Sequence, residues 1–157
     1  MREAGGPEGS ELYSTEEEIV RLVEAFEAFA LPQKQWTHQA HLTVGLWYVF
    51  HYPLEEATRR IRLGIQRYNE SCGVRMTRDG GYHETITLFY TWAIRRYLAS
   101  VEDRSSLVTL ANGLVNGRFS DRTFPLEYYS KDYLMSWDAR LHRVEPDRKP
   151  PEDGPHS

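Results

Sequence analysis

Three histidines lie where the sequence favours a common chemical site. His38 and His41 are three residues apart, so a helix would place both imidazoles on one face. His83 begins a second strongly apolar segment. Neutral imidazoles are good ligands for divalent transition metals, and three protein ligands with an open fourth position are typical of catalytic metal sites. Converging imidazoles would therefore hold a metal ion with a reactive water or dioxygen in the open position.

Side chains close to these histidines in the sequence could handle protons or hold a substrate. Glu84 follows His83 directly, so a helix would direct it about 100° away from the imidazole. We expect Glu84 and Tyr82 to be the catalytic residues, while whether Glu84 or Asp79 also ligates the metal stays open. The residues expected to bind substrate are Trp36, Tyr48, Asn69 and Thr87.

Helical periodicity covers most of the chain and supplies the elements that position these groups. Caps, prolines and glycines mark the ends of five expected helices, at about 15–30, 37–51, 53–71, 83–99 and 105–115. The second and fourth are apolar on most sides, which is typical of central helices. Two short helices are expected farther on, at 131–134 and 137–143.

The expected fold class is all-α, with four main helices in a bundle and a C-terminal segment of short helices wrapping it. Short connections make consecutive helices antiparallel, so the second and fourth should point the same way. Their first turns, which carry the three histidines, would then lie at one end of the bundle. We expect a flexible tail at 1–13, a single helical domain at 14–145 and a second flexible tail at 146–157.

Composition narrows the class of partner. The 157 residues suit one domain, and 40% hydrophobic content can build a core. A formal charge of −4 argues against nucleic acid. The single cysteine, Cys72, fits a reducing cytoplasm, and we expect a cytoplasmic protein without a membrane partner. Exposed apolar surface on the first or fifth helix could form a homodimer, but nothing in the sequence requires one.

Four short strings in this order resemble an uncharacterised bacterial family of small all-helical proteins. They are the segments 36–42, 68–69, 81–87 and 128–130, which include the motifs Thr-His-x-x-His and Tyr-His-Glu-Thr. The resemblance extends over about residues 26–147. That family has no settled activity, so the resemblance implies a fold and a set of marked positions. The pattern is not His-Glu-x-x-His, so a zinc-protease interpretation has no support.

Three functions remain open from the residues alone. The leading hypothesis is a metal-dependent hydrolase, isomerase or oxygenase that holds Zn, Fe, Mn or Cu through His38, His41 and His83. Helix amino ends beside the metal would favour a small anionic substrate. The second is a metal-free acid–base enzyme that uses His83 and Glu84. The third is a non-catalytic module that binds a small ligand or a partner protein, and metal analysis of untagged protein would separate the first from the others.

Overall fold

The computed structural model describes residues 11–151, and all regular secondary structure in this range is helical. The expected all-α class is therefore confirmed. No helix in the described range is long and apolar enough to cross a membrane. The α-helices are α1 (Glu16–Glu27), α2 (His38–His51), α3 (Leu54–Ser71), α4 (Glu84–Ser100), α5 (Leu107–Val115), α6 (Lys131–Leu134) and α7 (Trp137–Leu141), and the 3-10 helices are η1 (Gln33–Gln35), η2 (Arg118–Ser120) and η3 (Phe124–Glu127).

Side-chain caps begin several of the long helices. Thr15 starts α1 in a capping box with Glu18, in which each side chain bonds to the other residue's backbone N–H. The Thr37 hydroxyl accepts the backbone N–H of Ala40 at 3.1 Å and so starts α2. Ser106 caps α5 in the same way. Because such caps are local in sequence, the helix beginnings lie close to the predicted positions.

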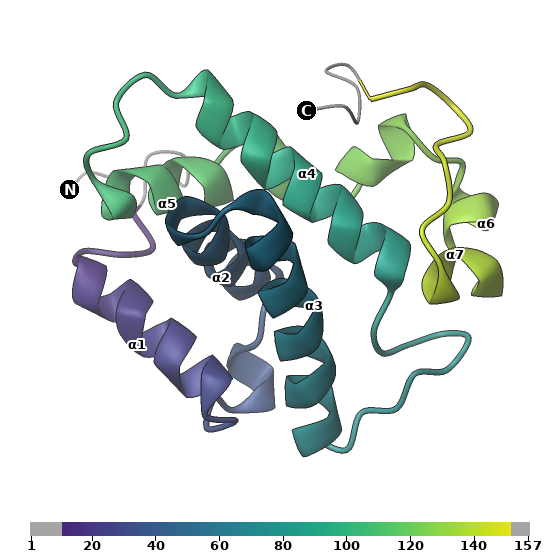
Figure 1. Ribbon diagram of the computed structural model, residues 1–157, viewed down its shortest axis with the longest axis horizontal. Coiled ribbons are helices and arrows are strands. Elements are labelled where there is room, and N and C mark those ends of the chain that lie inside the picture. The colour runs from purple at the N-terminus through teal and green to yellow at the C-terminus, as the bar shows by residue number, and fades with distance from the viewer. Residues whose placement is uncertain (1–10, 152–157) are drawn as a thin grey trace.

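Helix α2 lies at the centre of the molecule, where α1, α3, α4 and α5 pack around it (Figure 1). Leu42 and Leu46 belong to a core cluster that includes side chains of α4 and α5. Val44 and Tyr48 belong to a second cluster with side chains of α1 and α3. Burial on opposite faces explains why the sequence of α2 is apolar almost all round, as expected for a central helix.

Helix α4 lies between α2 and the C-terminal segment (Figure 1). One set of its side chains, including Ile94 and Leu98, joins the cluster around α2. Phe89 and Ala93 instead pack against a third cluster, whose other members are Phe124, Tyr128, Tyr129 and Leu134. The C-terminal segment is therefore held to the rest of the fold by a largely aromatic core.

Parts of both predicted tails are fixed to the domain. The backbone N–H of Tyr13 donates to Asn112 Oδ1 at 3.0 Å, and Asn112 Nδ2 donates to the Tyr13 carbonyl at 2.9 Å. Near the other end, Asp147 accepts the backbone N–H and the hydroxyl of Ser130 at 2.7 and 2.6 Å.

These contacts attach residues of both expected tails to the helical domain, while the domain boundaries expected at 14 and 145 stay a prediction. Composition suggested loose tails, but single polar side chains attach each end to a distant part of the chain, which composition does not reveal. The rest of the two expected tails, 1–10 and 152–157, lies outside the described residues.

Candidate functional site

A cavity of about 350 Å³ opens between α2, α3 and α4, beside the amino end of α2. The apolar residues that line it are Leu42, Gly45, Ile61, Ile65, Ile86 and Ile94. The polar and aromatic residues that line it are Trp36, Thr37, His38, His41, Thr87, Tyr90, Thr91 and Arg122. We refer to it as the α2–α4 cavity.

Both histidines of α2 line this cavity, in agreement with their spacing. The ring of His41 stacks on Trp36 with 3.7 Å between centroids, and its Nδ1 donates to the carbonyl of Thr37 at 2.8 Å. The ring of His38 meets Tyr90 edge-on with 5.2 Å between centroids. His38 Nε2 is buried without a hydrogen-bond partner among the described residues.

The surroundings of both rings favour the neutral imidazole. Loss of hydration lowers the pKa of His38, and the charge of Arg122 acts in the same direction, although the backbone of Ser120 opposes the shift. Loss of hydration also lowers the pKa of His41, against the opposing hydrogen bond to Thr37. Because the His41 side chain remains partly exposed, solvent limits the size of its shift. Both rings can therefore accept a hydrogen bond at neutral pH.

His83 does not line the α2–α4 cavity. It is the residue that caps the amino end of α4. Its Nδ1 accepts the backbone N–H of Ile86 at 3.1 Å, and its Nε2 donates to the carbonyl of Leu134 at 2.9 Å. Both ring nitrogens are thus engaged within the fold, and the residue is only 7% exposed. Since a metal ligand needs a free nitrogen lone pair, this arrangement suits a structural histidine.

The backbone at His83 explains why its side chain does not join the other two. The sequence suggested that His83 lies in the first turn of the helix, on the same face as Thr87. It is instead the capping residue, with extended backbone angles of φ −135° and ψ 111°, and α4 begins at Glu84. Within residues 11–151, no group of three or more His, Cys, Asp or Glu side chains is placed to hold a metal ion. The three-histidine site stays a prediction.

The expected catalytic residues, Glu84 and Tyr82, belong to a separate buried network. The Tyr82 hydroxyl donates to Glu84 Oε1 at 2.6 Å, and a guanidinium nitrogen of Arg62 lies 2.9 Å from Glu84 Oε2. Loss of hydration and the Glu84 carboxylate raise the pKa of Tyr82. Neither residue lines the α2–α4 cavity. The ion pair between Arg62 and Glu84 links α3 to the start of α4, and the catalytic role of Glu84 and Tyr82 stays a prediction.

The residues expected to bind substrate are divided among three places. Trp36 and Thr87 line the α2–α4 cavity with the two histidines of α2. Asn69 and Tyr82 line a different cavity, of about 300 Å³, at the carboxyl end of α3. Tyr48 lines a third, of about 210 Å³, on the side of the molecule where α1 and α3 meet.

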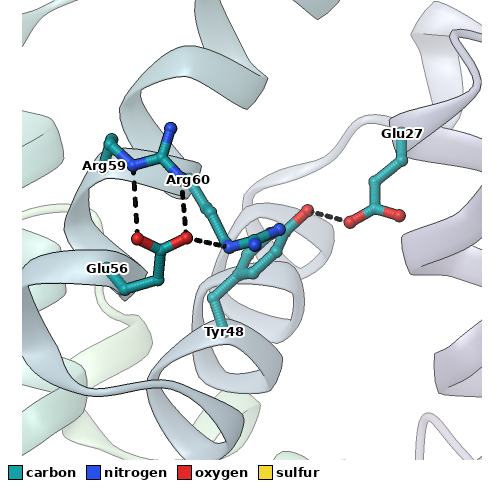
Figure 2. Close-up of polar contacts among 5 residues, drawn as sticks. All are labelled: Glu27, Tyr48, Glu56, Arg59 and Arg60. Atoms are coloured by element: carbon teal, nitrogen blue, oxygen red, sulfur yellow. Dashed lines mark hydrogen bonds and ion pairs between the residues drawn. The ribbon is translucent and has the colours of Figure 1, made fainter.

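Tyr48 takes part in polar contacts that connect α2 to α1. Its hydroxyl donates to Glu27, and loss of hydration together with this bond raises the pKa of Tyr48 (Figure 2). Close by on α3, Glu56 accepts from Arg59 at 2.7 Å and from Arg60 at 2.6 Å (Figure 2). Because these charges pair with one another, the basic stretch of α3 gives little reason to assign a substrate to this side.

Tyr90 and Arg122 line the α2–α4 cavity, although sequence reasoning assigned neither to a site. Tyr90 lies in a segment expected to be an apolar central helix, so its pattern did not distinguish it from core residues. Arg122 follows η2 in a segment without helical periodicity, so no pattern predicted where it would lie. In the structure Tyr90 meets the ring of His38, and Arg122 lines the same cavity.

No family model matches the chain, and neither does any curated protein or solved structure. The resemblance to a bacterial family therefore stays a prediction.

Proposed function

We propose that the protein binds a small, mainly apolar molecule in the α2–α4 cavity. Protein interiors are packed about as densely as organic crystals, so an apolar space left open reduces stability. Ligand sites are commonly cavities of this kind, with an apolar lining and a few convergent polar groups. The cavity of about 350 Å³, whose lining combines one leucine and four isoleucines with polar and aromatic side chains, is the observation that carries the proposal.

Two residues of the cavity lining have ring nitrogens without a hydrogen-bond partner among the described residues, which favours a ligand with a polar group. Trp36 Nε1 and His38 Nε2 are both buried without a hydrogen-bond partner among the described residues. Leaving such groups unpaired destabilises a protein, so each calls for a partner.

This proposal corresponds to the ligand-binding alternative among the three hypotheses. The acid–base alternative relied on His83 and Glu84, whose polar atoms are occupied by Leu134, Ile86, Arg62 and Tyr82. The metal-dependent alternative relied on a lone pair of His83 that Ile86 already uses. Binding in the α2–α4 cavity requires none of these groups to change partners.

A fluorescence titration with phenylnaphthylamine tests the proposal, because this uncharged probe brightens when it leaves water. The natural protein should bind it saturably. Ile65, which is half-buried on α3, lines the cavity. The substitution Ile65→Phe should fill part of the space and weaken binding by about tenfold or more, which corresponds to about 1.4 kcal/mol.

Leu63→Phe is the matched control, since Leu63 is also half-buried on α3 but lines the cavity near Tyr48. It should leave the affinity for the probe within about twofold. Melting temperatures of both variants establish that they fold. Absence of saturable binding by the natural protein, or equal losses in the two variants, would contradict the proposal.

A further inference from the structure

The α2–α4 cavity adjoins a second one, which enlarges the site beyond the proposed function. The second cavity has a volume of about 230 Å³ and is lined on its far side by Pro125, Leu126, Lys131, Leu134 and Met135. Four residues line both spaces: His38, Ile86, Tyr90 and Arg122. We refer to these four residues as the shared wall. A ligand in the α2–α4 cavity would contact this wall, which includes the guanidinium group of Arg122.

The charge at this wall is positive in a protein whose net charge is −4. Arg122 lines both cavities and Lys131 lines the second, whereas no Asp or Glu of the described residues lines either one. Neither cation forms an ion pair with a described residue. Such unpaired cations beside an apolar space complement a ligand with a negative group.

One carboxylate is close enough to weaken this field. Asp121 precedes Arg122 and its charge acts on His38. Its Oδ1 already accepts the backbone N–H and the hydroxyl of Thr123, at 2.8 and 2.7 Å. Asp121 is engaged there and lines neither cavity. Among the described residues, Arg122 is therefore the one charged side chain of the shared wall, and Lys131 is the one on the far side of the second cavity.

Trp36, which lines the α2–α4 cavity but not the shared wall, also favours a ligand with an acceptor group. The indole N–H of Trp36 can only donate, and it is buried without a partner among the described residues. The amino end of α2, which starts at His38, adds partial positive charge on the same side. A carboxylate oxygen would satisfy a donor of this kind more strongly than a neutral oxygen does.

We propose that the ligand is an amphipathic monocarboxylate, with its apolar body in the α2–α4 cavity and its carboxylate at the wall formed by Arg122 and His38, on the side facing Lys131. This inference rests on the proposed function, because it assigns a chemical class to the occupant of the same cavity. It requires that removing the negative charge from a ligand of fixed shape weakens binding.

Calorimetric titrations with naphthylacetate and naphthylacetamide test the inference, because the two probes share one shape and differ in charge. The carboxylate should bind about five- to tenfold more tightly than the amide, as expected for one or two partly exposed ion pairs. The substitution Arg122→Gln should bring the two affinities to within about twofold of each other, by weakening the carboxylate alone. Added salt should reduce the difference in the natural protein.

Arg21→Gln is the matched control, because it removes the same charge from the exposed face of α1, away from both cavities. It should preserve the difference between the two probes. Equal affinities in the natural protein, including no binding by either probe, overturn the inference, and so does a difference that Arg122→Gln leaves unchanged. Failure of the proposed function is a separate result, since it would appear as no saturable binding of the uncharged phenylnaphthylamine.

Discussion

His83 shows how one side chain can serve two elements at once. Its Nδ1 starts α4 by accepting the backbone N–H of Ile86, in the manner of a serine or aspartate cap. Its Nε2 fixes the carbonyl of Leu134 at the end of α6. Since the ring is buried, neither partner can turn to water if the imidazole is removed.

Two substitutions at this position separate its tasks. His83→Ala should lower the free energy of unfolding by about 2 kcal/mol, because the cap and a buried hydrogen bond are both lost. His83→Asn should lose about half as much, since its short side chain can still cap the helix but does not reach Leu134. Denaturant unfolding measures both values. Equal losses for Ala and Asn would show that capping contributes nothing here.

At the scale of elements, the connection between α3 and α4 depends on the backbone conformation of one glycine and on hydrogen bonds from one arginine. Gly81 has a φ of 87°, in the left-handed region that favours glycine. Arg140 of α7 is buried and donates to the carbonyls of Gly81 and Tyr82 at 2.9 and 3.2 Å. The C-terminal segment thereby fixes the approach of the chain to His83 and the start of α4.

Gly81→Ala should destabilise the protein by about 2 kcal/mol or more, because it combines backbone strain with a steric clash. An added Cβ would lie 2.6 Å from the backbone oxygen of Arg75. At the neighbouring Gly80 the nearest atom to such a Cβ is Thr77 Oγ1, at 3.9 Å, so Gly80→Ala should change stability by less than about 0.5 kcal/mol. Thermal or denaturant unfolding compares the two variants, and similar values would show that this backbone conformation is not required.

The helix bounds were largely predictable because the signals that set them are local. Thr37 caps α2 through an N–H three residues away, and Gly73, with a φ of 76°, follows the end of α3. The same local geometry placed His38 and His41 on one face. The position of Arg122 was not predictable, since it depends on how the irregular chain after α5 packs against α2 and α4.

At the scale of the whole molecule, stability should depend on pH through three histidines: His83, which is buried, His38, which is half-buried, and to a smaller degree His41, which is exposed. Loss of hydration lowers the pKa values of His38, His41 and His83 in the folded protein. Above pH 7 these rings are neutral in both folded and unfolded states. Below the unfolded value of about 6.5 the unfolded chain takes up protons first, so acid favours unfolding.

We therefore expect the free energy of unfolding to be smaller at pH 5 than at pH 7.5, as measured by denaturant titration. His83→Asn should reduce this dependence, because it removes one of the three groups, while His51→Gln on the exposed end of α2 serves as the control. The aspartates with lowered pKa values, Asp103, Asp121 and Asp147, act only in stronger acid. Stability that is unchanged or greater at pH 5 would contradict this account.

The sequence by itself determined the all-helical class, the approximate helix bounds and the shared face of His38 and His41, because each depends on residues within one or two turns of chain. Only the tertiary structure decided that His83 turns to Leu134, 51 residues away, instead of toward the other two imidazoles. It also decided that Glu84 pairs with Arg62 and that Arg122 lines the same cavity as His38. Such contacts form when distant segments pack, and side chains of one type and spacing can satisfy several partners, so local pattern does not select among them.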